Sequence, residues 1–134
     1  MWKGWNGEKY DHNILFYKEW TVEASQQLID MDAGFMRLLD VLPVTKGAIP
    51  SLLEYYESYD AESLTNKISS MPAFQNITSP MKKVDGGWIP DFDSRYFTED
   101  FPYGLKYLIS LAKENNVDCP NLNKVFEWGM SKCK

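Results

Sequence analysis

The 134-residue sequence contains few of the side chains that bind metals or act as nucleophiles. It has one histidine, His12, and two cysteines, Cys119 and Cys133. A histidine-based zinc site is therefore excluded, and a Ser-His-Asp or Cys-His catalytic set would have to use His12. Neither cysteine lies in a CxxC pair and no secretory signal is visible, so we expect free thiols in a cytoplasmic protein.

Long apolar runs, excess basic charge and glycine-rich motifs are also missing. No apolar run approaches the roughly 20 residues of a membrane span, so we expect no membrane partner. With 19 acidic against 14 basic residues, the formal net charge is −5, which argues against DNA or RNA as a partner. None of the eight glycines falls into a GxGxxG pattern. The chain should therefore not bind a dinucleotide by itself.

Hydrophobic periodicity predicts helices along most of the chain. From Val22 to Leu42, apolar residues recur every three or four positions, as in one long amphipathic helix. Thr21 is placed to cap its first turn, and Pro43 ends it. Shorter helices are expected near 50–60, 61–71, 99–116 and 120–132. The pattern indicates a single all-α domain of five or six helices over residues 1–134, large enough to bury its own core.

The second and third helices are expected to be joined closely. Leu52, Leu53, Tyr56 and Tyr59 should share one side of the second helix. Asp60 then suits the capping position of the third helix.

Strand signals are weak. Residues 13–17 form a short apolar run that could be extended, but no other run offers it a partner. Residues 72–98 contain three prolines and the pair Gly86-Gly87, with apolar anchors between them. We interpret this stretch as an ordered connection that faces a ligand, because it is longer than most loops.

Aromatic residues crowd the start of the chain. They could form a platform that binds rings, or they could pack in the core or between domains, and the second interpretation is favoured. The residues concerned are Trp2, Trp5, Tyr10, Phe16, Tyr17 and Trp20.

The segment around position 95 carries the most distinctive chemistry. It combines Arg95 with the carboxylates of Glu99 and Asp100 near an expected helix start. The Arg95 guanidinium matches a carboxylate, and Asp100 in the first turn of a helix could hold a cation, so the two could bind a zwitterion. The simpler interpretation is that the acidic residues only favour the helix start and that Arg95 pairs with one of them on the surface.

The same segment carries a family resemblance. The chain resembles the carboxy-terminal helical domain of the octopine/nopaline (opine) dehydrogenase family in the run Arg95-Tyr96-Phe97-Thr98-Glu99-Asp100-Phe101-Pro102-Tyr103-Gly104-Leu105. Residues 116–121 continue this likeness, and residues 15–21, 49–56 and 71–77 are similar to that domain in the same order. The resemblance covers nearly the whole chain and implies a 6-phosphogluconate dehydrogenase C-terminal-domain-like fold.

The resemblance also implies an activity. In that family an amino-terminal Rossmann domain binds NAD(P)H, and an amino acid and a 2-oxo acid are condensed and reduced between the two domains. This chain would be the substrate-binding and catalytic helical domain, inactive alone, with NAD or NADP bound mainly by an amino-terminal domain absent from this chain. Arg95 and Asp100 would be catalytic, and Arg95, Asp100 and Tyr103 would bind substrate. Arg95 would orient a carboxylate, while Asp100 would work with a histidine or hold the amine.

The chain departs from the family pattern at its start. The family's catalytic histidine lies in a His-Pro stretch just ahead of the segment resembling Met1-Trp2-Lys3-Gly4-Trp5, so we expect a fragment or a split gene product. His12 is expected to be a solvated or capping residue. Without a nucleotide domain, an apolar face would be exposed and would invite homodimerisation. The alternative function is therefore a non-catalytic interaction or dimerisation module.

Overall fold

The computed structural model describes residues 2 and 4–133. It confirms the predicted helical domain and adds one small sheet. The elements in chain order are α1 (Val22–Val41), α2 (Leu52–Tyr55), α3 (Ala61–Ser70), the 3-10 turn η1 (Pro72–Phe74), β1 (Met81–Val84), β2 (Gly87–Pro90), α4 (Arg95–Thr98), the π-helical turn η2 (Asp100–Leu105), α5 (Lys106–Glu114) and α6 (Pro120–Met130).

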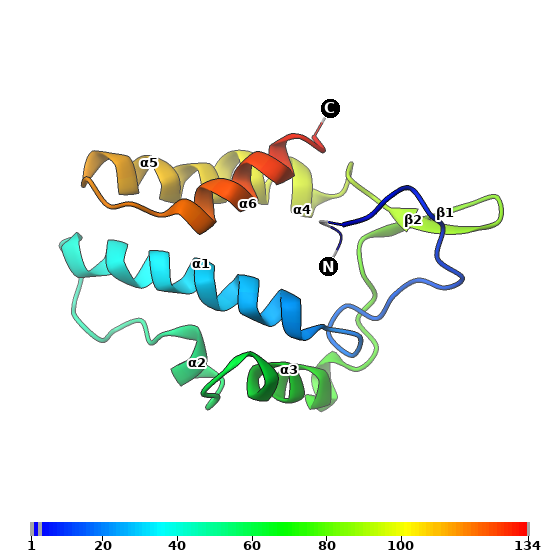
Figure 1. Ribbon diagram of the computed structural model, residues 1–134, viewed down its shortest axis with the longest axis horizontal. Helices are drawn as coiled ribbons and strands as arrows, with labels where there is room; N and C mark the ends of the chain where they lie inside the picture. Colours follow the sequence, from blue (N-terminus) through cyan, green and yellow to red (C-terminus); the bar gives the residue numbers. More distant parts are fainter. Residues whose placement is uncertain (1, 3, 134) are drawn as a thin grey trace.

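The long helix α1 lies in the middle of the molecule and is covered on two sides (Figure 1). Helices α2 and α3 pack on one side, and α5 and α6 pack on the other. Ser25 is buried toward α3, where its hydroxyl hydrogen-bonds with the hydroxyl of Thr65 at 2.7 Å. Because both sides of α1 are packed, this helix sets the spacing between the two layers.

The ends of α1 form as the sequence predicts. The Thr21 hydroxyl accepts a hydrogen bond from the Ala24 N–H at 3.2 Å and so satisfies one free donor of the first turn. Glu23 adds a negative charge near the positive end of the helix. The helix ends at Val41, just ahead of Pro43.

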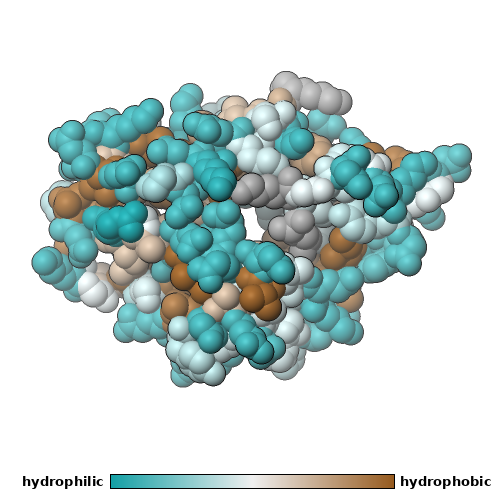
Figure 2. Space-filling model, in the orientation of Figure 1, coloured by the Kyte–Doolittle hydropathy of each residue, from teal (hydrophilic) through white to brown (hydrophobic). Residues whose placement is uncertain are grey.

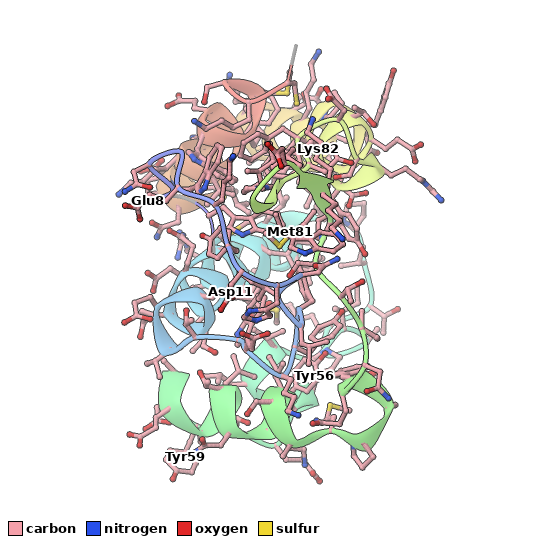
Figure 3. The ribbon with its side chains drawn as sticks, turned by 90° about the vertical axis from the view of Figure 1, so that its right-hand side faces the viewer. Glu8, Asp11, Tyr56, Tyr59, Met81 and Lys82 are labelled. Carbon is pink, nitrogen blue, oxygen red and sulfur yellow. The ribbon has the colours of Figure 1, made fainter. Side chains whose placement is uncertain are left out.

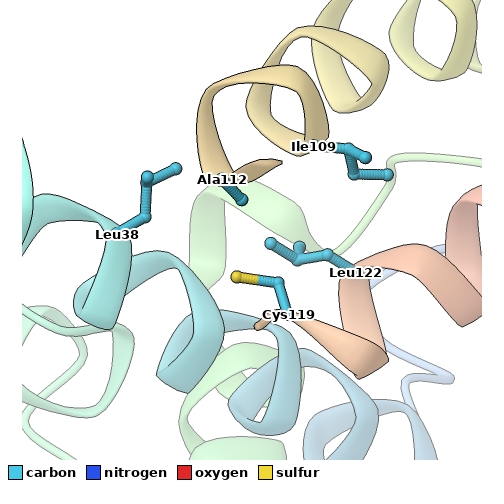
Figure 4. Close-up of a cluster of buried hydrophobic side chains, with 5 residues drawn as sticks. All are labelled: Leu38, Ile109, Ala112, Cys119 and Leu122. Carbon is cyan, nitrogen blue, oxygen red and sulfur yellow. The ribbon is translucent and has the colours of Figure 1, made fainter. Parts of the chain in front are cut away.

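The main core lies between α1, α5 and α6 (Figure 4). Gly34 of α1 lies against the start of α6, where a Cβ would be in ordinary van der Waals contact with the Cys119 sulfur at 3.5 Å. The Cys119 thiol donates a hydrogen bond to the Gly34 carbonyl at 3.4 Å, and burial raises its pKa. The buried members of the cluster are Leu38, Ile109, Ala112, Cys119 and Leu122.

The second helix is shorter than predicted. It is a single turn that Ser51 caps by accepting a hydrogen bond from the Glu54 N–H. Tyr59 lies beyond it and is 82% exposed, so the prediction that it shares a packed side with Leu52 is wrong (Figure 3). The predicted cap of α3 is confirmed, because Asp60 and Ser63 form a reciprocal capping box.

An antiparallel hairpin of β1 and β2 occupies part of the stretch that the sequence suggested to be an ordered connection facing a ligand. Met81 pairs with Pro90, and Val84 pairs with Gly87. Isolated bridges join Tyr10 to Trp88 and Leu15 to Thr78, so residues 13–17 do have a partner. The expectation that strands find no partner is therefore wrong.

Gly87 allows the segment at Tyr10 to approach β2 closely. Its φ is +148°, and a Cβ there would collide with the Tyr10 carbonyl oxygen. The Tyr10 N–H donates to the Trp88 carbonyl and the Trp88 N–H donates to the Tyr10 carbonyl, both at 2.9 Å. The Asp85-Gly86 pair between two short runs is a local signal for the hairpin of β1 and β2. Tyr10, which pairs with the other edge of β2, is distant in sequence and has no such signal.

The helical segment that holds the candidate site begins earlier than predicted. It starts at Arg95 rather than near Glu99, with Ser94 at the capping position. Pro102 has no N–H to donate, and the chain accommodates it in the π-helical turn η2 instead of starting a helix there. Asp100 therefore lies in the second turn of this segment, not the first.

Much of the molecular surface shown in Figure 2 is hydrophilic, with apolar groups in separate patches. Within the described part of the chain, every helix is too short or too polar to cross a lipid bilayer.

Gly129 provides a test of the packing between α6 and η2. A Cβ at this position would overlap the ring of Phe101. Gly129→Ala should lower the free energy of unfolding by about 1–3 kcal/mol, because overpacking outweighs the gain of roughly 1 kcal/mol that alanine brings to a helix. Urea denaturation followed by circular dichroism measures this change.

Gly104→Ala is the matched control, because a Cβ there meets nothing within 4 Å. This variant should be neutral or more stable by up to about 1 kcal/mol. Equal stability changes for the two alanine variants would contradict the described contact at Gly129.

Candidate functional site

A cavity of about 440 Å³ lies beside the start of the α4 segment and is lined by Arg95, Tyr96 and Asp100. Among the described residues that line it, Arg95 and Asp100 are the ones that the sequence singled out. Arg95 and Asp100 are five positions apart, and the helical path through Glu99 brings both to the same cavity. Their joint placement remains compatible with the predicted zwitterion site.

Arg95 also pairs with Glu99, one turn along the helix. Its Nε and Nη2 donate to Glu99 Oε2 at 3.2 and 3.1 Å. The Arg95 side chain is 85% exposed, so the pair adds little to stability. The bonds hold one edge of the guanidinium, and Nη1 makes no hydrogen bond to any described residue. Arg95 thus pairs with an acidic residue on the surface, as the simpler interpretation predicts. The pairing still leaves guanidinium donors that a ligand could use.

Asp100 is exposed and has no hydrogen-bond or ion-pair partner within residues 4–133. Its carboxylate is therefore free to accept hydrogen bonds from a cationic ligand. Tyr103, the third predicted site residue, is 74% exposed on η2 and does not line the cavity. The structure thus brings Arg95 and Asp100 together and leaves Tyr103 apart.

Tyr96 lines the cavity although the sequence gave it no separate role. Its ring is stacked with that of Phe16, with centroids 6.3 Å apart and planes 18° apart. Phe16 belongs to the aromatic group at the start of the chain, which packs within the fold as favoured above. Nothing local in the sequence signals the contact, because the two rings are 80 positions apart.

His12 lies in an exposed polar cluster and does not line the cavity. Its Nδ1 contacts the Asp11 carboxylate, and its Nε2 lies 2.9 Å from Glu19 Oε1. Asp11 and then Glu19 raise the pKa of His12 above 6.5, and His12 lowers the pKa of Asp11. Burial opposes the ionisation of Glu19, but the Leu15 N–H and His12 outweigh it and lower the Glu19 pKa.

The described residues do not fit a dinucleotide. Their strands form a two-stranded antiparallel hairpin with no parallel βαβ unit, so the backbone lacks the turn that cradles a pyrophosphate. What the cavity offers instead is a planar cation beside an anion. A guanidinium can bind a carboxylate and a carboxylate can bind an ammonium, so the site suits a small zwitterion or a pair of oppositely charged groups.

Comparison with known proteins identifies the family. Residues 3–133 match the family described as NAD/NADP octopine/nopaline dehydrogenase, alpha-helical domain. The chain belongs to this family. Its likeness to the octopine/nopaline dehydrogenases, expected from the run at 95–105, is thereby confirmed.

Named relatives of the family agree. Tauropine dehydrogenase of Arabella iricolor is 28% identical over 95% of this chain and 35% of its own length. Octopine dehydrogenase of Pecten maximus is 28% identical over 98% of this chain and 36% of its own length. The chain thus spans about a third of the length of the curated relatives it matches.

Solved structures of octopine dehydrogenase show the same fold. One described with NADH and pyruvate matches with a TM-score of 0.85 and 25% identity, over 98% of this chain and 34% of that one. Another, described with NADH and L-arginine, matches with a TM-score of 0.81 and 26% identity, over 98% and 35%. The fold of the opine dehydrogenase helical domain is thereby confirmed.

The His12 cluster makes a titration prediction. A proton NMR titration of the His12 ring should give a midpoint above 6.5. Protonated His12 contributes stability that is complete below pH 6.5 and lost as pH rises through its raised pKa. The contributions of Asp11 and Glu19 are complete above their ordinary values of 3.8 and 4.5 and are lost as pH falls through their lowered pKa values.

Glu19→Gln should lower the His12 midpoint, because it removes one of the two carboxylates. Glu23→Gln, in the first turn of α1, is the control and should leave the midpoint unchanged. An unchanged His12 midpoint in Glu19→Gln would show that the contact between Glu19 and His12 Nε2 does not persist in solution.

Proposed function

We propose that this chain is the substrate-binding helical part of an opine-dehydrogenase-like oxidoreductase. The complete enzyme would reductively condense an amino acid with a 2-oxo acid, using NADH or NADPH. The observation that carries this proposal is the cavity where the guanidinium of Arg95 and the carboxylate of Asp100 stand together. Relatives described with pyruvate and with L-arginine support it, since pyruvate carries a carboxylate and L-arginine carries both a carboxylate and a cationic amine.

Each charged residue has a role in this proposal. Arg95 binds and orients a substrate carboxylate through the donors that Glu99 leaves free, while Glu99 fixes the rotation of the guanidinium. Asp100 holds the substrate amine or works with a catalytic histidine supplied from outside residues 4–133. Tyr103 remains a predicted substrate contact that would need to be reached by a longer ligand or by a closing partner domain.

The nicotinamide cofactor would be held by a separate amino-terminal part. The described residues offer no dinucleotide fold, which supports this division of labour. We place the enzyme in the cytoplasm, in keeping with the free thiols of Cys119 and Cys133.

A second candidate function is self-association. Three aliphatic side chains beyond and at the end of α1 are exposed: Val41, Val44 and Ile49, at 51%, 44% and 46%. Val44 and Ile49 also line a small hollow next to this end of the helix. Val44→Asp should dissociate a homodimer formed here, whereas Arg95→Ala should leave it intact. Sedimentation velocity measures both outcomes.

The enzymatic proposal is tested by kinetics of the complete enzyme, meaning this chain joined to or mixed with a nucleotide-binding part. Oxidation of NADH should require both an amino acid, such as L-arginine, and pyruvate. Arg95→Ala should lower kcat/KM about 10- to 100-fold, since charged hydrogen bonds contribute about 1.5–3 kcal/mol. Arg95→Lys should fall between, because it keeps the charge and loses the planar fork.

Lys113→Ala, at an exposed position in the last turn of α5, is the control and should keep full activity. Asp100→Asn should behave like Arg95→Ala, with both variants as stable as the original chain. Full activity in both Arg95→Ala and Asp100→Asn would refute the site.

A further inference from the structure

We infer that Phe16 is a positioning residue for the cavity: its ring fixes Tyr96, the aromatic wall beside Asp100, and thereby sets the affinity for the amino-acid substrate. The inference rests on the proposed function and extends it to a residue 80 positions away from the cavity in sequence. It assigns to the start of the chain a role in substrate binding that is distinct from holding the fold together.

The contact between the two rings is the first support. Tyr96 lines the cavity and is 51% exposed, so about half of its surface is covered by the protein. Phe16 stacks on it with centroids 6.3 Å apart and planes only 18° apart. Within the described residues, Phe16 is the one ring stacked on Tyr96.

Phe16 is itself held firmly, which makes it a suitable support. Its N–H donates to the Ile77 carbonyl at 2.7 Å, and the Ser79 N–H donates to the Ile14 carbonyl at 2.7 Å. These bonds lie on either side of the Leu15–Thr78 bridge. The backbone of the segment is therefore held by hydrogen bonds at both Ile14 and Phe16.

Neighbouring rings restrict the Phe16 side chain as well. Tyr17 meets it edge-on at 4.8 Å, and the Trp20 ring lies 5.5 Å away. Trp20 is anchored in turn, since its Nε1 donates to the buried Ser25 hydroxyl of α1 at 2.9 Å. A chain of contacts thus runs from α1 through Trp20 and Phe16 to Tyr96.

Arg95 is held in a different way. Its guanidinium is 85% exposed and is oriented by Glu99, with no contribution from Phe16. Loss of the Phe16 ring should therefore disturb Tyr96, which lines the cavity with Asp100, and leave the Arg95 guanidinium held by Glu99. The expected signature is a raised KM for the amino acid with little change in kcat or in the KM for the 2-oxo acid.

The size of the effect follows from the freedom that Tyr96 would gain. Ordering one mobile side chain on binding corresponds to a loss of roughly three- to tenfold in affinity. An aromatic face that is no longer fixed also loses part of its attraction for an ammonium group.

The test uses the complete enzyme with L-arginine and pyruvate. Phe16→Leu should raise the KM for L-arginine roughly three- to tenfold, with kcat and the KM for pyruvate within about twofold, and Phe16→Tyr should restore the KM. Phe74→Leu is the matched control. It also removes a phenylalanine ring, but Phe74 stacks on Tyr17, with centroids 4.3 Å apart, and not on Tyr96. Both leucine variants should lower Tm, but only Phe16→Leu should change the KM.

Tyr96→Leu alone covers the case in which Phe16→Leu folds poorly, and a double-mutant cycle tests whether the two rings act together. Tyr96→Leu removes the wall itself and should raise the KM for L-arginine at least as much. Adding Phe16→Leu to Tyr96→Leu should then change the KM no further, because the two rings act as a unit.

An unchanged KM in Phe16→Leu, or an equal rise in Phe74→Leu, would overturn this inference while leaving the proposed function intact. Failure of the proposed function looks different. In that case NADH oxidation would not depend on the two substrates, or Arg95→Ala would keep full kcat/KM.

Discussion

Burial of α1 on two opposite sides is the constraint on which the rest of the structure depends. On one side its Ser25 hydroxyl bonds to Thr65 of α3, and on the other Leu38 enters the cluster formed with α5 and α6. A helix packed on both sides can neither rotate nor slide without disrupting one of the layers. The cavity lies on the segment leading into α5, and its aromatic support, Phe16, is connected through Trp20 to Ser25. The positions of both therefore depend on α1.

The features that the sequence predicted well are those whose causes are local. The caps at Thr21 and Asp60 and the stop before Pro43 lie within a turn of the helix ends they control. The hairpin has a local signal in Asp85-Gly86, but its pairing with Tyr10 could not be predicted, because Tyr10 lies 77 positions from Gly87. The start of the α4 segment was misplaced because Pro102 usually marks a first turn, whereas here a π-helical turn absorbs it.

Only part of the candidate site could be predicted from the sequence. Arg95 and Asp100 could be singled out because their charges stand out in a short run that resembles the family matched over residues 3–133. Both interpretations of Arg95 hold at once, since it pairs with Glu99 and still lines the cavity. Tyr96 and Phe16 carry no such signal, because an aromatic pair distant in sequence looks like ordinary core until the fold brings it to a cavity.

The hairpin has a consequence for how this domain avoids self-recognition. In the described part of the chain, β1 pairs on one side only, so its outer edge presents unpaired backbone groups. Such an edge is a template for another extended chain. Lys82 and Lys83 are both exposed on β1. Lys82 pairs with Asp91 and Asp93 at 3.7 and 3.3 Å, whereas Lys83 has no ion-pair partner among the described residues, so two copies meeting edge to edge would bring their Lys83 charges together. The charge of Lys83 thus opposes the pairing of two copies through the open edge of β1.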